Sequence, residues 1–179
     1  HSCFELRNSA GKVAIIDPYL NGNPHRAIRS EEIEKVDVVL VTHGGRDHLG
    51  DAYDIVKRTG AYMISSVDVY HGALRVGIPK EQLFGMPSGA VHEHAGFRVK
   101  STDARHVSMT KLPDLYITGQ PLGFLIWPEP TAPEILLYHL GDTSISYDMK
   151  MAKELWAPPM AIVGLGGAPD LPHDMDPDE

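Results

Sequence analysis

The sequence predicts a layered α/β domain, and three observations support this fold class. Residues 36–41 form a nearly continuous apolar run rich in valine, which is typical of a strand buried on both faces of a sheet. A strand, helix, strand alternation follows this run, as in domains where helices cover a sheet. The chain of 179 residues shows no internal repeat, so we expect one domain over residues 1–179 with an irregular tail over 164–179.

Short local signals set the order and the ends of the elements. Turn-forming residues over 8–11 join two strands into a hairpin, and Pro18 is expected to end the second strand with Asp17 in extended geometry. Ser30 is expected to cap a short helix, and Gly60 to end a longer one. The predicted strands are 3–7, 12–16, 36–41, 61–65, two within 90–104, 123–127, 135–139 and a buried last strand over 160–163; the predicted helices are 51–58, 67–76 and 149–155.

The composition disfavours several classes of protein. With 24 acidic and 16 basic residues the net charge is −8, and basic residues are not clustered, so a nucleic acid is not favoured as a partner. The single cysteine, Cys3, cannot form an internal disulfide, which makes the cytoplasm the default location. Cys3 is expected to be a small buried apolar residue, because no neighbouring base or cation indicates a reactive thiol. No apolar run reaches the roughly 20 residues that span a membrane, so no membrane partner is expected. Association of this chain into a homo-oligomer stays an open alternative.

Ten histidines indicate metal binding or acid–base chemistry, and the segment over residues 42–51 is the most informative place to look. It places His43, Asp47 and His48 between a buried strand and a helix. These are ligand types that zinc and similar ions prefer, and a tight loop after a rigid strand brings them together, with two glycines allowing the sharp turn. In the alternative interpretation the loop is merely polar, with His48 capping the helix and Asp47 bonded to backbone amides.

Other predicted strands also end in metal-binding types of residue. His106 follows the strand predicted after Gly96, and Asp142 lies just past the strand over 135–139. In layered α/β folds, strand ends and the loops that leave them are where sites form. Asp17 is a further carboxylate at a strand end, and we expect it to orient a ligand histidine without binding the metal itself.

Taken together, these segments resemble the metallo-β-lactamase superfamily, and within it the ascorbate-6-phosphate-lactonase-like branch of metal-dependent hydrolases. The resemblance implies a four-layer αββα sandwich with a metal site at one edge of its two sheets. The segments that carry it are His1-Ser2-Cys3-Phe4, Ile16-Asp17-Pro18, Val41 to Asp51, His106 and Tyr138 to Thr143, in this order along the chain. The metal ligands that the resemblance implies are His43, Asp47, His48, His106 and Asp142.

Two positions depart from the family pattern. The second histidine of the family motif falls on Gly45, which has no side chain to bind a metal. The family's last histidine ligand would lie beyond Glu179, and the resemblance also implies more sequence before His1, so we expect a chain truncated at both ends. His173 is the nearest substitute for that last ligand. Of one or two metal ions per chain, we therefore favour one.

The leading interpretation is a metal-dependent hydrolase that acts on a small-molecule substrate. A divalent ion, zinc first and manganese or iron as alternatives, would supply a bound hydroxide to an ester, lactone, phosphodiester or related bond. Asp47 and Asp142 would be the catalytic carboxylates, which orient the nucleophile or accept its proton. Arg46 and His1 are expected to contact the substrate.

Two alternatives stay open at this point. One is a degenerate, non-catalytic member of the superfamily, whose metal site has decayed at Gly45 and which acts as a binding or structural domain. The other is a pocket for an anionic small molecule, with Arg46 and Arg105 as contacts. Three of the remaining histidines are not expected to bind metal: His92 and His94 lie on a solvated strand face, and His139 lies in the core, bonded to the backbone.

Overall fold

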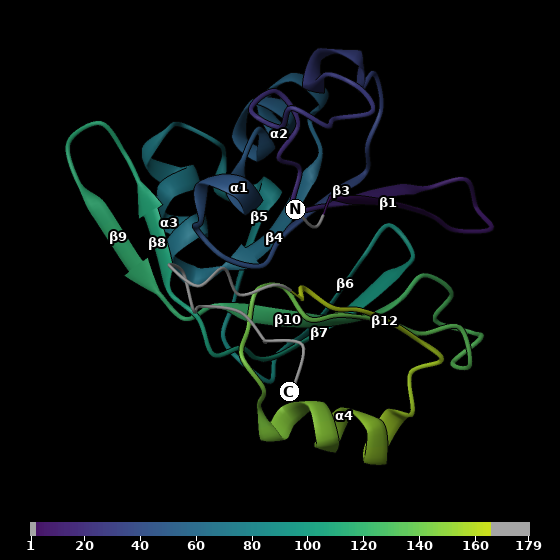
Figure 1. Cartoon of the computed structure of the whole chain (residues 1–179). Coiled ribbons are helices and arrows are strands. Elements are labelled where there is room, and N and C mark those ends of the chain that lie inside the picture. The colour runs from purple at the N-terminus through teal and green to yellow at the C-terminus, as the bar shows by residue number, and fades with distance from the viewer. Residues whose placement is uncertain (1–2, 166–179) are drawn as a thin grey trace.

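The computed structural model describes residues 3–165, and its centre is a pair of sheets packed face to face (Figure 1). The first sheet has five strands in the order β1-β2-β3-β4-β5. β1 is antiparallel to β2, and the other neighbours are parallel, as expected for strands linked by helical crossovers. Its strands are β1 Phe4–Arg7, β2 Val13–Ile16, β3 Val38–Val41, β4 Tyr62–Ser66 and β5 Leu83–Met86.

The second sheet also has five strands, in the order β12-β11-β10-β7-β6. β12 is parallel to β11, and the other neighbours are antiparallel. The sheets pack through apolar side chains such as Ile16 and Leu40 from the first and Phe97 and Phe124 from the second, which are completely buried. The strands are β6 Val91–His94, β7 Phe97–Asp103, β10 Leu122–Trp127, β11 Leu137–His139 and β12 Met160–Ile162.

Helices cover the outer face of each sheet and complete the αββα sandwich that the resemblance implied. On the first sheet, Ile55 and Val69 come from helices α2 and α3 and share a core with Val41. On the second, Ala152 of α4 packs against Leu125. Figure 1 shows α4 lying along this sheet. No helix in residues 3–165 is long and apolar enough to cross a membrane. The helices are α1 Arg46–Leu49, α2 Ala52–Thr59, α3 Val67–Arg75 and α4 Tyr147–Trp156, with short 3-10 turns at Ser30–Glu32 and Lys80–Gln82.

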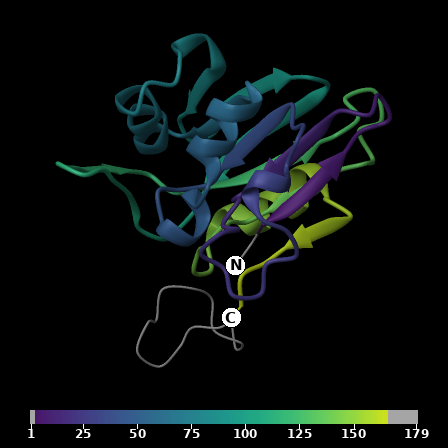
Figure 2. The same ribbon diagram turned by 90° about the horizontal axis from the view of Figure 1, so that it is seen from above.

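A two-stranded hairpin stands apart from both sheets, and the sequence did not predict it. It consists of β8 Ser108–Lys111 and β9 Tyr116–Gly119, which pair only with each other. The hairpin packs against α3 and extends away from the sandwich (Figure 2). The residues of β8 alternate between buried and exposed, but the buried positions are the hydroxyl residues Ser108 and Thr110. Without an apolar face, the segment lacks the usual signal of a strand.

Three local expectations are wrong. Ser30 begins its 3-10 turn instead of capping it, because its hydroxyl accepts a hydrogen bond from Asn21 Nδ2 at 2.8 Å. The last strand, β12, is an edge strand and not a buried one, with Met160 62% exposed. Asp17 precedes a proline, yet its φ is +44°, in the left-handed region and not extended. Its carboxylate is held in this position by hydrogen bonds from the amide of Thr42 and from Nδ1 of His48, which lie far from it in the sequence.

Candidate metal centre

The predicted site residues lie together at one edge of the sandwich, where strands of both sheets end. Two backbone contacts hold this edge together. The amide of Leu122 donates to the carbonyl of Thr42 at 3.1 Å, which joins the second sheet to the loop after β3. Arg105 and Ser144 form an isolated antiparallel bridge, which joins the loop after β7 to the loop after β11. Asp17 follows β2, His43 follows β3, Asp47 and His48 lie in α1, His106 follows β7 and Asp142 follows β11.

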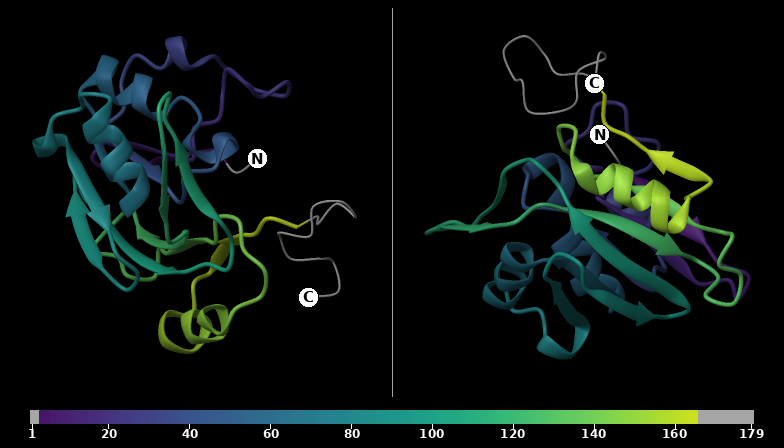
Figure 3. Two further views of the ribbon diagram at one scale, coloured as in Figure 1. Left: turned by 90° about the vertical axis from the view of Figure 1, so that its left-hand side faces the viewer. Right: turned by 90° about the horizontal axis from the view of Figure 1, so that it is seen from below.

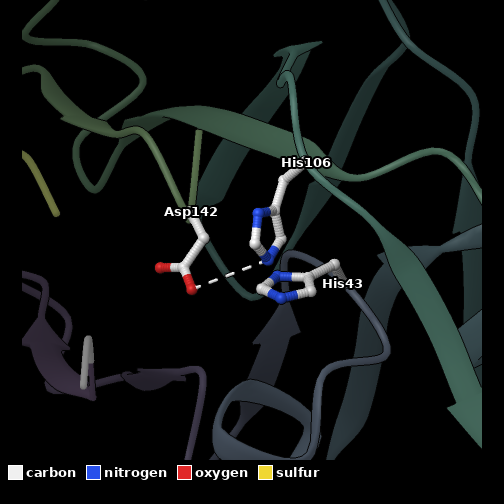
Figure 4. Close-up of side chains that lie close together, drawn as sticks. All are labelled: His43, His106 and Asp142. Atoms are coloured by element: carbon white, nitrogen blue, oxygen red, sulfur yellow. Dashed lines mark ion pairs between the residues drawn. The ribbon is translucent and has the colours of Figure 1, made fainter. Parts of the chain in front are cut away.

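Two sets of three side chains could each hold a metal ion. One consists of His43, His106 and Asp142, and the other of Asp47, His48 and Asp142. Within each set, one ligand atom from every residue lies within 4.8 Å of the others. Figure 4 shows the imidazoles of His43 and His106 and the carboxylate of Asp142 turned toward a common space; His106 Nε2 and Asp142 Oδ2 are 4.0 Å apart. Asp142 is the residue that both sets share.

His48 lies between two carboxylates in the interior of the site. Its Nδ1 is 2.8 Å from Asp17 Oδ2, and its Nε2 is 3.0 Å from Asp142 Oδ1. Burial alone would lower the pKa of His48, but the charge of Asp17 and the hydrogen bonds to both carboxylates raise it to about 10. Burial would likewise raise the pKa of Asp17, yet the charge of His48 brings it down to about 2. The two carboxylates therefore favour the protonated form of this buried ring.

His43 is buried beside His48 but carries no charge. Burial, together with repulsion from His48, lowers the pKa of His43 to about 4. Its Nδ1 lies 3.1 Å from the hydroxyl of Thr42, which leaves Nε2 facing the site. A Cβ at Gly45 would come within 2.5 Å of that Nε2, so glycine keeps the space next to this nitrogen clear. The absence of a side chain at Gly45 thus removes one ligand and opens room beside another.

The two glycines of the loop are required by close approach and not by a left-handed backbone. Neither has a positive φ. A Cβ at Gly44 would lie 2.5 Å from the amide nitrogen of Thr110 and 2.6 Å from the carboxylate of Asp68. The amide of Gly44 itself donates to the hydroxyl of Ser108 at 3.0 Å. The metal loop therefore rests directly on the root of the β8–β9 hairpin.

A cavity of about 730 Å³ opens beside the candidate metal ligands. His43, Asp47 and His106 form part of its wall, and Arg46 stands at the same end. This volume is within the range of small-molecule sites. The cavity gives the ligand atoms an open side from which a substrate can approach. Most of the remaining wall is apolar: Leu49, Tyr53, Val76, Val107, Met109, Leu112, Pro113 and Tyr116, with Lys111 as a second cation.

The other residues that the sequence singled out lie outside the candidate metal centre or outside the described residues. Arg105 is exposed but does not line the cavity that Arg46 lines, so the two do not form one pocket. His1 and His173 lie outside the described residues. His139 is confirmed as a core histidine, since it is fully buried and its Nδ1 accepts a hydrogen bond from the amide of Gly141 at 3.2 Å.

Two other expectations concern a cysteine and a pair of histidines away from the site. Cys3 is half-buried against the core, and burial raises its pKa to about 12, which fits an inert thiol. The solvated face expected for His92 and His94 is wrong. Both rings are half-buried and stacked on aromatic neighbours. The ring centre of His94 lies 4.0 Å from that of Tyr62, and the ring centre of His92 lies 4.0 Å from that of Phe84.

One buried acid at the site was missed by sequence reasoning. Asp68 is 1% exposed and accepts hydrogen bonds from the hydroxyls of Ser108 at 2.7 Å and Thr110 at 3.0 Å. It lies in the first turn of α3, where an aspartate is common for reasons of helix stability alone. A sequence signal does exist: Ser108 and Thr110 are two residues apart, so on a strand their hydroxyls face the same side and need a buried partner such as Asp68.

Comparison with known proteins gives a consistent result. A family model described as a beta-lactamase superfamily domain matches residues 14–175. A UPF0173 metal-dependent hydrolase from Nitratidesulfovibrio vulgaris is 36% identical over 99% of this chain and 69% of its own length. A UPF0173 metal-dependent hydrolase from Methanopyrus kandleri is 36% identical over 93% of this chain and 69% of its own length. The solved structure of a metallo hydrolase from Ignicoccus hospitalis superposes with a TM-score of 0.77 at 29% identity, over 97% of this chain and 70% of that one.

Proposed function

Since this chain belongs to the beta-lactamase superfamily, and its relatives are metal-dependent hydrolases, we propose that it cleaves a bond of the ester class, such as an ester, lactone or phosphodiester. A divalent ion at the site would lower the pKa of a water molecule toward neutrality and so supply a hydroxide nucleophile. The observation that carries the proposal is the convergence of His43, Asp47, His48 and His106 around one carboxylate, Asp142.

The donor set fits a divalent ion. Imidazole nitrogens and carboxylate oxygens are the ligands that zinc, manganese and iron share. We favour a single ion held by Asp47, His48 and Asp142, because two carboxylates balance its double charge. The hydrogen bond from His48 Nδ1 to Asp17 also fixes the ring in the way that oriented metal-binding histidines require. An ion would take the place of the proton on His48 Nε2, next to Asp142.

The chain's own residues divide the remaining work. Asp47 lines the cavity, and both Asp47 and Asp142 are only half-buried, so either carboxylate can accept the proton of the attacking water. Arg46 is exposed at the same end of the cavity and can bind a negatively charged group of the substrate. The resemblance to the ascorbate-6-phosphate-lactonase-like branch predicts a lactone among the ester, lactone and phosphodiester bonds, and this stays a prediction.

The experiment measures hydrolysis of p-nitrophenyl acetate by the purified chain before and after treatment with a chelator. We expect the chelator to abolish activity, and zinc or manganese to restore it. In Asp142→Ala, which removes the shared carboxylate, neither metal should restore it. Asp114→Ala is the matched control, because Asp114 is an exposed acid in the turn between β8 and β9, where it pairs with Arg75 and is not a candidate ligand.

Full activity after chelation, or in Asp142→Ala, would contradict the proposal. A chain that binds the metal but cleaves no ester would favour the degenerate, non-catalytic alternative, whose basis is Gly45 in place of a ligand. Activity retained in Asp114→Ala would show that the loss in Asp142→Ala comes from that particular carboxylate and not from the replacement of any acid.

A further inference from the structure

The β8–β9 hairpin has two faces with different chemistry. In β8, Ser108 and Thr110 are buried, while the alternate residues Met109 and Lys111 are exposed and line the cavity. This follows from the period of two in a strand, which turns successive side chains to opposite faces. Tyr116 of β9 joins the cavity face directly opposite Lys111 in the pairing register. The hairpin therefore supplies a wall of the cavity, and Figure 3 shows it standing beside the helices.

The opposite face of the hairpin is anchored to the body of the protein. The carboxylate of Asp68 accepts hydrogen bonds from Ser108 and Thr110, and Ser108 in turn accepts one from the amide of Gly44. A Cβ at Gly119 would overlap the side chain of Asp68, so β9 packs closely on it as well. The anchor fixes the wall relative to the metal loop, so the cavity has a defined shape and is not merely a gap behind a mobile strand.

The charges of the cavity are unbalanced once the candidate metal ligands are set aside. Arg46 and Lys111 are then the charged residues of the wall. Within residues 3–165, neither cation forms an ion pair with a carboxylate; Lys111 Nζ lies 5.8 Å from the ring centre of Tyr116. Around them, Met109 is 43% and Tyr116 55% exposed, which are large values for apolar side chains. The surface suits a ligand that has both an apolar part and a negative charge.

We propose that this cavity binds amphipathic monoanions, in which an apolar chain lies along Met109 and Tyr116 and a carboxylate meets Arg46 or Lys111. Arg46 comes from α1 and Lys111 from β8, so either cation can meet a single carboxylate. In combination with the proposed hydrolase function, on which this step rests, the substrate is an ester or lactone whose acyl part is apolar and carries a carboxylate. The binding claim itself needs no hydrolysis.

Binding of three small probes to the protein as purified tests the proposal by calorimetry. Octanoate has the apolar chain and the charge, octan-1-ol has the chain alone, and butanoate has the charge with a shorter chain. We expect octanoate to bind at least about tenfold more tightly than either, because four buried methylene groups and a charge each contribute that much. Equal affinity for octanoate and octan-1-ol, or for octanoate and butanoate, would overturn the proposal.

Variants assign the preference to the named residues. In Arg46→Gln combined with Lys111→Gln, the preference for octanoate over octan-1-ol should fall below about threefold, while octan-1-ol binds as before. In Met109→Ser, the preference for octanoate over butanoate should fall. Lys150→Gln is the control, because Lys150 is exposed on α4, away from the cavity. A preference for octanoate that survives the double variant would assign carboxylate binding to a bound ion and refute the role of the two cations.

Chain-length and charge preferences remain measurable if the protein cleaves no ester at all. In that case the proposed hydrolase function fails and the binding proposal stands or falls on the calorimetry. Conversely, metal-dependent cleavage of p-nitrophenyl acetate without any preference for octanoate would leave the hydrolase function intact and reject the substrate class.

Discussion

Asp17 shows how a single residue organises the site. Its backbone lies in the left-handed region, with φ at +44°, a conformation that costs a non-glycine residue on the order of 1 kcal/mol or more. The carboxylate offsets this cost by accepting three hydrogen bonds at 2.8 Å: from the amide of Thr42, from the hydroxyl of Thr42 and from Nδ1 of His48. The strain thus places a buried acid behind the histidine that we propose as a ligand.

Replacing this acid should weaken metal binding without removing a ligand. In Asp17→Asn, the amide cannot hold the imidazole of His48 with a charge-assisted hydrogen bond, so the ring loses its fixed orientation. Because such supporting groups contribute roughly 10- to 100-fold in metal affinity, we expect the zinc dissociation constant to rise by that factor. A competition titration against a fluorescent chelator measures it.

Asp37→Asn is the matched control for that prediction. Asp37 is also a hydrogen-bonded acid at a strand end, accepting from the amide of Val13 and the ammonium of Lys12, both at 2.9 Å, but it is not among the candidate ligands. Its substitution should leave the zinc affinity unchanged. If Asp17→Asn binds zinc within about twofold of the unaltered chain, Asp17 does not position His48.

At the scale of elements, the β8–β9 hairpin depends on a polar anchor where most strands depend on apolar contacts. Among the described residues, 3–165, it pairs with no other strand, and two-stranded hairpins are marginal on their own. Asp68, buried in the first turn of α3, supplies the missing attachment through the hydroxyls of Ser108 and Thr110. This carboxylate therefore anchors the wall of the cavity, in addition to the packing of the hairpin on α3.

Removing that carboxylate should loosen the hairpin more than the sandwich. In Asp68→Ala, two buried hydroxyls lose their acceptor, so the free energy of unfolding should fall by about 1–3 kcal/mol. Amide exchange should become faster in β8 and β9, while β3 and β10 keep their protection. Hydrogen exchange followed by mass spectrometry, together with urea unfolding, measures both effects.

Asp114→Ala serves as the control on the same hairpin, since Asp114 lies in its turn region and forms only an exposed ion pair with Arg75 at 3.0 Å. A change within about 0.5 kcal/mol is expected there. Equal exchange rates in β8 and β9 of Asp68→Ala and Asp114→Ala would show that the anchor does not hold the wall.

The elements show what periodicity can and cannot predict. Strong apolar runs located β3 and β10, and Gly60, whose φ is +74°, ends α2 as expected. The hairpin and the four-residue helix α1 escaped prediction because polar side chains and loop contacts, not an apolar face, hold them in place. The left-handed backbone of Asp17 escaped for the same reason, since distant partners determine it.

At the scale of the whole molecule, the sandwich brings together loops that are far apart in the sequence. Ligand candidates from both sheets meet at one edge because the backbone of Leu122 bonds to Thr42 and Arg105 bridges to Ser144. Strand ends predicted the individual residues, and the family resemblance predicted that they form one site. The cavity wall could not be predicted, because it depends on how the hairpin packs on α3 and not on any motif.

The central claim is that this edge of the sandwich holds one divalent metal ion. The metal content of the purified chain, measured by inductively coupled plasma mass spectrometry beside the same measurement on Asp142→Ala, tests it most directly. We predict close to one equivalent of zinc, manganese or iron per chain, and its loss in Asp142→Ala, which removes the carboxylate common to both candidate ligand sets. Two equivalents per chain, or a metal content that Asp142→Ala does not change, would contradict the claim.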